Sequence, residues 1–233
     1  MQAGICGLVT GTFDRLSDVT DTVTRDGRDL TRSMTIDRVF SLPGGEMGFI
    51  GTAASERMTT RTATTIVDGE ITDREEAVKE TVRTRFCGVP GAFVVTESAA
   101  GTFVFELVGA ATDTTVRRAR LDLSGLFGAI DDSSCWKAGF YDRPDHAEKG
   151  TLYGENLMTD DTVESMLTDA SLNQLGVVFT DSTDEIRADV TESGFVRLTR
   201  PGGLAVDEFL AILLERVRPH LETPSDGSPE RRD

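Results

Sequence analysis

The chain has 233 residues, 38% of them hydrophobic and 27% charged, with a formal net charge of −16. This length suits one large domain or two small ones, and the apolar share is sufficient for a core. No run of about 18 uncharged apolar residues occurs, which excludes a membrane-spanning helix. The acidic balance disfavours nucleic-acid binding, because phosphates require a basic surface. The first residues lack a secretory signal pattern, so we expect a cytoplasmic protein.

The composition is acidic, poor in lysine and rich in threonine. Only Lys79, Lys137 and Lys149 are lysines among the 24 basic residues, and threonine occurs 30 times. Molar salt screens repulsion between carboxylates, so this balance is typical of a halophile's cytoplasm. The alternative is a surface for a basic partner. The three cysteines are far apart and only two histidines occur, so we expect no metal site and no cofactor.

The first half of the chain predicts strands interrupted by two helices. Phe13, Leu16 and Val19 lie at helical spacings and favour a helix over residues 13–23. A capping-box pattern at Thr72 predicts a second helix, which ends at Gly88. The predicted strands cover residues 4–11, 34–40, 47–53, 61–67, 92–96, 102–108 and 115–123.

The second half begins with an irregular segment, residues 131–156. Helices are predicted over residues 161–169 and 204–218, and strands over residues 175–180, 185–191 and 195–199. Because strands come in runs rather than in strict alternation with helices, we expect an α+β fold of layered antiparallel sheets with flanking helices. The expected organisation is residues 1–130, a second α+β portion over 131–221 packed on the first, and a disordered tail over 222–233.

Two short motifs could carry chemistry. Cys6 lies between glycines at the start of a predicted strand, and a thiol with a lowered pKa is a nucleophile. The plain alternative is a small apolar residue in a buried strand. Asp68, Gly69 and Glu70 precede the helix predicted at Thr72 and could bind a ligand at its N-terminus. An Asp-Gly turn explains the same residues equally well.

Taken in order, three motifs resemble the N-terminal domain of class II glutamine amidotransferases of the asparagine synthetase type. They are Cys6-Gly7-Leu8, Asp68-Gly69-Glu70-Ile71 and Gly91-Ala92-Phe93-Val94-Val95, within about residues 4–125. The resemblance implies a four-layer αββα sandwich of the N-terminal-nucleophile type. It also implies that Cys6 is the nucleophile and that Asp68, Gly69 and Glu70 lie near the glutamine.

The chain departs from that family at three points. Five residues precede Cys6, whereas the family uses the free α-amine of its cysteine as the base, so Cys6 would need to be the mature N-terminus. Asp68 replaces the family's Asn, and a carboxylate there would repel an oxyanion. The Ser-Gly-Gly-x-Asp-Ser loop of the ATP-using half is missing. The resemblance therefore implies an inactive or altered stand-alone domain.

The segment from Cys135 to Glu155 gathers rare residues, including the single Trp136. A candidate ligand or partner loop follows from Trp136, Tyr141, His146 and Tyr153. The alternative is an ordered surface loop that covers the end of a sheet.

Two hypotheses follow from these observations. The first is a stand-alone amidotransferase-like domain without normal activity. The second is a non-catalytic interaction or regulatory protein that binds an unidentified protein partner or a second copy of itself.

Overall fold

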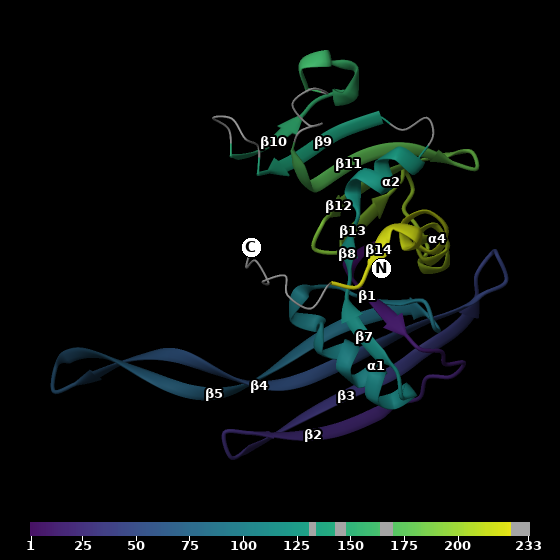
Figure 1. Cartoon of the computed structure of the whole chain (residues 1–233). Coiled ribbons are helices and arrows are strands. Elements are labelled where there is room, and N and C mark those ends of the chain that lie inside the picture. Colours follow the sequence, from purple (N-terminus) through teal and green to yellow (C-terminus); the bar gives the residue numbers. More distant parts are fainter. Residues whose placement is uncertain (131–133, 143–147, 164–169, 225–233) are drawn as a thin grey trace.

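The computed structural model describes residues 1–130, 134–142, 148–163 and 170–224. It has an α+β fold dominated by one large antiparallel sheet, which confirms the predicted class (Figure 1). Eleven of the twelve strands of this sheet follow the order β10-β9-β11-β12-β13-β1-β6-β5-β4-β3-β2, and the twelfth, β7, pairs with β1. The strands are β1 (Ala3–Thr10), β2 (Val19–Arg25), β3 (Arg28–Ser41), β4 (Met47–Val67), β5 (Glu70–Val89), β6 (Phe93–Thr96), β7 (Thr115–Arg118), β9 (Ser134–Tyr141), β10 (Lys149–Tyr153), β11 (Ser171–Asp181), β12 (Asp184–Thr191) and β13 (Phe195–Thr199).

The helices are short and lie against the sheet. They are α1 (Phe103–Thr112), α2 (Leu123–Ala129) and α4 (Val206–Ile212), and α4 continues into a π-helical segment at Leu213–Val217. The remaining elements are the 3-10 turns η1 (Ala99–Gly101), η2 (Leu157–Thr159) and η4 (Arg218–His220), and a two-stranded sheet of β8 (Arg120–Leu121) and β14 (Leu221–Glu222). Within the described part of the chain, no helix is long and apolar enough to cross a membrane.

Strand β1 joins the two halves of the sheet. Ile5 lies opposite Phe195 of β13 on one side and Thr96 of β6 on the other. Because side chains alternate along a strand, Cys6 and Leu8 enter the larger core, which contains α2 and α4. Ile5 and Val9 enter a smaller core under α1. The sheet is therefore continuous from the lower to the upper half of the molecule in Figure 1.

The helix predicted from Thr72 is wrong, because these residues belong to β5. Val78, Val82 and Phe86 suggested a helical face, but a spacing of four is even and also places them on one face of a strand. Strand β5 pairs with β4 residue by residue from Val67 opposite Glu70 to Phe49 opposite Gly88. This long ladder pairs the N–H and C=O groups on the inner edge of β5 with those of β4.

Two further assignments in the first half are also wrong. Residues 13–23 are not a helix, since Val19 begins β2 and the preceding segment is a loop. Phe13 and Leu16 pack from that loop against the small core, which explains their apolar character. The strand predicted over residues 102–108 is helix α1, because a short apolar run fits a buried helix as well as a buried strand.

In the second half, the three predicted strands and the last helix are confirmed as β11, β12, β13 and α4. The irregular segment predicted over residues 131–156 is wrong where the structure describes it, because β9 and β10 form an antiparallel pair. The helix predicted over residues 161–169 lies mostly outside the described residues, as does the tail from residue 225.

Candidate functional site

Cys6, the candidate nucleophile, lies in the middle of the sheet. It lies opposite Val95 of β6, its N–H donates to the Gly194 carbonyl at 2.9 Å, and its own carbonyl accepts from the Ala119 N–H at 2.9 Å. Its side chain is 0% exposed, and this burial raises the pKa of the Cys6 thiol to about 12. A thiol in this environment stays protonated near neutral pH, so it is a poor nucleophile.

The residues before Cys6 are part of the fold. Ala3, Gly4 and Ile5 lie opposite Arg197, Val196 and Phe195 of β13. Gln2 donates a side-chain hydrogen bond to the Leu204 carbonyl at 2.9 Å, next to α4. A free α-amine on Cys6 would therefore require removal of the residues that hold β1 against β13.

The other two cysteines are also core residues. Cys87 and Cys135 are free and buried, and burial raises the pKa of both thiols. The residues that the structure describes contain no group of three or more His, Cys, Asp or Glu side chains arranged to hold a metal ion.

Asp68, Gly69 and Glu70 lie far from Cys6, at the β4–β5 turn (Figure 1). Asp68 and Gly69 both have positive φ, at 53° and 84°, and they connect Val67 to Glu70 as a two-residue hairpin turn. This conformation is typical of Asp-Gly in a type I′ turn, so the turn interpretation describes these residues. The structure does not bring this turn and Cys6 together.

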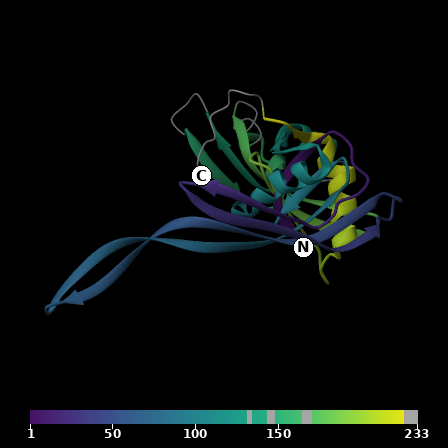
Figure 2. The same ribbon diagram turned by 90° about the horizontal axis from the view of Figure 1, so that it is seen from below.

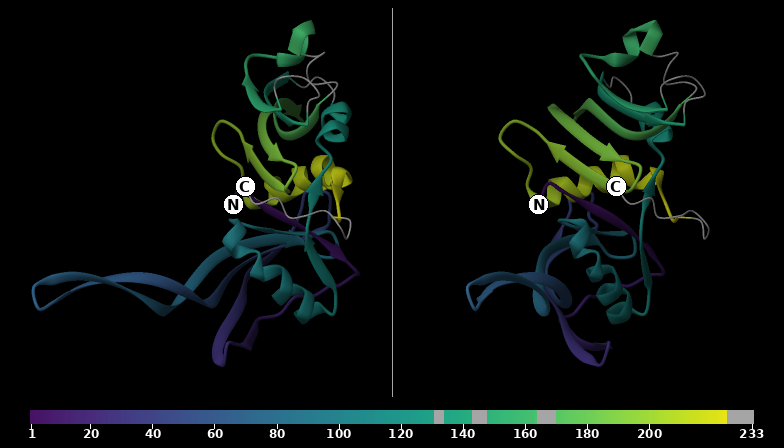
Figure 3. Two further views of the ribbon diagram at one scale, coloured as in Figure 1. Left: turned by 60° about the vertical axis from the view of Figure 1, so that its left-hand side comes forward. Right: turned by 90° about the vertical axis from the view of Figure 1, so that its left-hand side faces the viewer.

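The β4–β5 hairpin extends well beyond the body of the molecule, and we call residues 56–85 the arm. Strand β3 pairs with β4 only as far as Ser55, and β6 pairs with β5 only from Phe86. From Glu56 to Val67 the hairpin is therefore a two-stranded ribbon among the described residues, about 40 Å long at the usual rise of a strand. The arm points away from both cores in all views (Figures 1, 2 and 3).

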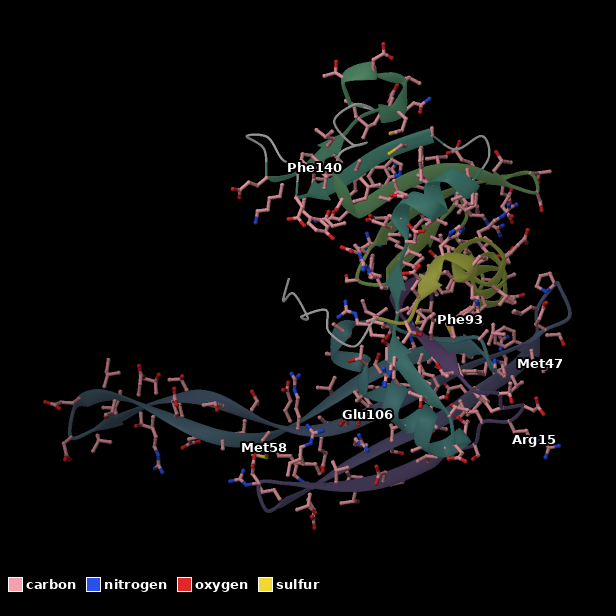
Figure 4. All side chains as sticks on the ribbon, in the orientation of Figure 1. Arg15, Met47, Met58, Phe93, Glu106 and Phe140 are labelled. Atoms are coloured by element: carbon pink, nitrogen blue, oxygen red, sulfur yellow. The ribbon has the colours of Figure 1, made fainter. Side chains whose placement is uncertain are left out.

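The arm ends in an exposed apolar tip, which consists of Ile66, Val67 and Ile71. Ile66 and Ile71 lie directly opposite each other and are 74% and 76% exposed, and Val67 is 56% exposed. Side chains of this size are normally buried, and exposed clusters of them mark interaction sites. In Figure 4 the side chains of the arm beyond Met58 extend outward on both sides, and no other ribbon lies beside them.

The base of the arm borders a cavity of about 480 Å³. Residues from β2, β3, the arm, η1 and the start of α1 line it, including Leu30, Arg32, Met58, Val82 and Phe103. Arg32 binds Asp21 and Glu106, each at 2.5 Å, and its hydrogen bond lowers the pKa of Asp21. Two carboxylates therefore neutralise Arg32, and Arg32 holds β2, β3 and α1 together.

Trp136 and Tyr153, two of the predicted loop residues, lie on β9 and β10, on the outer face of the large sheet in the upper half of the molecule in Figure 1. Their ring centroids are 6.5 Å apart, and the Arg187 guanidinium stacks 3.8 Å above the Trp136 ring. Trp136 also lies flat over Gly176, where an added Cβ would come within 2.5 Å of the indole. The structure therefore brings these two aromatics together, but it builds them into the sheet surface rather than a loop.

Of the other two predicted loop residues, the structure describes Tyr141 but not His146. The Tyr141 hydroxyl donates to Glu192 at 3.1 Å, and the same Glu192 oxygen binds Arg120 at 2.5 Å. This network ties β9 to the β12–β13 turn region and gives Tyr141 a structural role. His146 lies outside the described residues.

No known protein family, curated protein or solved structure matches this chain. The described residues place the cysteines in the core, the acidic turn at the end of the arm and the aromatic pair on the upper sheet. The feature that sequence reasoning missed is the arm itself. Its signal was present, because Asp68-Gly69 separates two runs rich in Thr, Val and Ile, which is a hairpin pattern.

Proposed function

We propose that this chain is a non-catalytic protein-binding protein and that the arm is its binding element. One observation carries the proposal: a long two-stranded ribbon leaves the body and ends in the exposed side chains of Ile66, Val67 and Ile71. Beyond its base the arm contributes no residue to either hydrophobic core, so core packing does not explain its length. Recognition of another chain supplies one.

The energetics of the arm favour a bound state. Burying a large aliphatic side chain contributes about 1.5–3 kcal/mol, and the tip carries three such side chains. An isolated two-stranded hairpin is only marginally stable in water, whereas a further strand or an apolar groove stabilises it. A partner that covers the tip would therefore order the end of the arm as it binds.

The amidotransferase-like function and the sandwich of the N-terminal-nucleophile type stay predictions. Their support is weaker, because that chemistry needs a reactive thiolate near its substrate-binding turn. Cys6 is buried with a raised pKa, and Asp68 and Gly69 form the turn of the arm. The partner surface expected around Trp136 also has weaker support than the arm, because Arg187 and Tyr153 already contact its ring.

The test is an affinity capture from extracts of the native cells, compared between three versions of the chain. In Ile66→Thr/Ile71→Thr the tip loses its apolar surface but keeps a residue that suits strands. Val39→Thr on β3 is the matched control, since Val39 is exposed to the same extent as Val67 but lies in the body. We expect the wild type and the control to retain the same proteins, and the tip variant to retain them at least about tenfold less.

Two results would contradict the proposal. One is an unchanged set of captured proteins with the tip variant. The other is glutamine hydrolysis by the purified chain that disappears in Cys6→Ala, because it would establish a catalytic thiol.

A further inference from the structure

The outer edge of β5 is unpaired along most of the arm. Among the described residues, β4 is the only strand that pairs with β5 between Glu70 and Thr84. An unpaired edge presents a row of N–H and C=O groups that can accept another strand. The side chains along this edge determine which strand can pair with it.

The charges along β5 are unevenly distributed. Asp73, Glu75 and Glu76 lie toward the tip, whereas Lys79 and Arg83 lie toward the base. Arg74 and Glu80 are the exceptions in their respective halves. If two copies of β5 pair antiparallel, the acidic half of each copy faces the basic half of the other. Two identical strands related by a two-fold axis pair in this way.

Resting on the proposed role of the arm, we propose that the arm's partner is a second copy of this chain, bound through β5 with Ala77 opposite Ala77 of the second copy. In this register Glu75 of each copy lies opposite Lys79 of the other. Arg74 likewise lies opposite Glu80. Two interactions, each formed twice, therefore join opposite charges, and directly opposed charges of opposite sign stabilise a strand pair.

The neighbouring symmetric registers all oppose like charges. If the pair is centred on residue 75, 76, 79 or 80, that charged residue lies opposite the same residue of the second copy. Centring it on Val78 places Glu76 opposite Glu80 twice. Only the register centred on Ala77 avoids such a conflict, and its central residue is small. The sequence of β5 thus specifies one self-complementary register.

The structure leaves room for this pairing. In the nine-residue segment from Asp73 to Thr81, which is symmetric about Ala77, every residue is exposed except the half-buried Val78. Lys79 and Glu80 bind Glu56 and Arg57 across the arm, yet their side chains remain 47% and 48% exposed. The bodies would lie at opposite ends of the paired arms, since each arm extends away from its own body (Figures 1 and 2).

The same register also gives the apolar tip a contact. Ile71 of one copy lies opposite Arg83 of the second copy, whose aliphatic stem can cover an apolar neighbour. The tip of each arm thus lies against the base of the other arm.

The experiment is sedimentation velocity on the full chain over a series of concentrations, in ~0.15 M salt, where charge effects are only partly screened. In Glu75→Lys the new lysine of each copy would lie opposite Lys79 of the other, which places like charges together at two symmetric positions. We therefore expect the dimer dissociation constant to rise at least about tenfold. The double variant Glu75→Lys/Lys79→Glu restores opposite charges and should restore dimerisation. Glu155→Lys makes the same charge change at an exposed residue outside the arm and should leave the dimer intact.

Each remaining outcome overturns the self-pairing. They are a wild type that stays monomeric, a dimer that Glu75→Lys does not weaken, and a double variant that fails to recover while circular dichroism shows it folded. The proposed function would survive any of these if the capture by the apolar tip still depends on Ile66 and Ile71. If that dependence is absent as well, the role of the arm in binding fails with it.

Discussion

Shortening the arm should leave the stability of the body nearly unchanged. The perturbation replaces residues 61–76 by Asn-Gly, which joins Thr60 to Ala77. These two residues already lie opposite each other in the ladder, and Asn-Gly suits a two-residue turn of the kind at Asp68-Gly69. The shortened chain keeps every residue of both hydrophobic cores.

The expected magnitude follows from burial. All sixteen residues removed are exposed except Ala63, which is half-buried. The free energy of unfolding should therefore change by less than about 1 kcal/mol. Phe86→Ala, at the buried end of β5, is the contrasting variant, because Phe86 is 0% exposed and its truncation should cost about 3–5 kcal/mol.

Urea unfolding followed by circular dichroism measures both values. The experiment should be run at a concentration where the chain is monomeric, because self-association would add stability to the wild type alone. The slope of the transition should change little, since the arm buries little surface on folding. A loss above about 2 kcal/mol in the shortened chain would refute the reasoning, because it would mean that the arm packs on the body.

Two further predictions concern individual groups. The pKa of Cys6 is raised from 9.0 to about 12, so its thiolate fraction is about a thousandfold below that of an ordinary cysteine. Ellman's reagent at pH 8 should therefore leave Cys6 unmodified until the chain unfolds, and rapid labelling of the native protein would contradict its burial. A hydrogen bond from the Ala205 N–H, and a second from Arg200, lower the pKa of Glu208 below its ordinary value of 4.5. Its contribution to stability is therefore complete above pH 4.5 and disappears as the pH falls through the lowered pKa. The free energy of unfolding of Glu208→Gln should lie below that of the wild type at neutral pH and converge with it in acid, whereas a constant difference would contradict this assignment.

The predicted class and most strands follow from local patterns. Strands β12 and β13 alternate in burial, and α4 presents Val206, Phe209 and Leu210 to the core at helical spacing. In these segments the period of apolar residues identifies the element without ambiguity.

The wrong secondary-structure predictions arise where one spacing of apolar residues fits both a helix and a strand. In β5 the spacing of four between Val78, Val82 and Phe86 fits a helix and a strand alike. The capping-box pattern at Thr72 then favoured the helix. The deciding factor was the partner strand β4, whose complementary length makes a continuous ladder possible. Pairing across such a distance is a tertiary effect, which a window of local sequence does not contain.

The candidate site could be predicted only in part. The sequence predicted the grouping of Trp136 with Tyr153, and it offered the turn at Asp68 and Gly69 as one of two alternatives; both exist. It attached the turn to a helix instead of to the end of the arm, so the exposed pair of Ile66 and Ile71 had no apparent meaning. Exposure depends on the absence of covering elements, and this follows from the fold rather than from the residue types.

Hydrogen exchange along the arm tests the central claim most directly. Amide exchange in Asp73–Thr81 is measured on the native chain as its concentration increases, with β1 as the internal reference. The account predicts that alternate arm amides, those facing the outer edge of β5, become protected with concentration while the β1 amides stay constant. Arm amides whose exchange is independent of concentration, across the range in which the charge variants are compared, would contradict the claim that this edge binds a second copy.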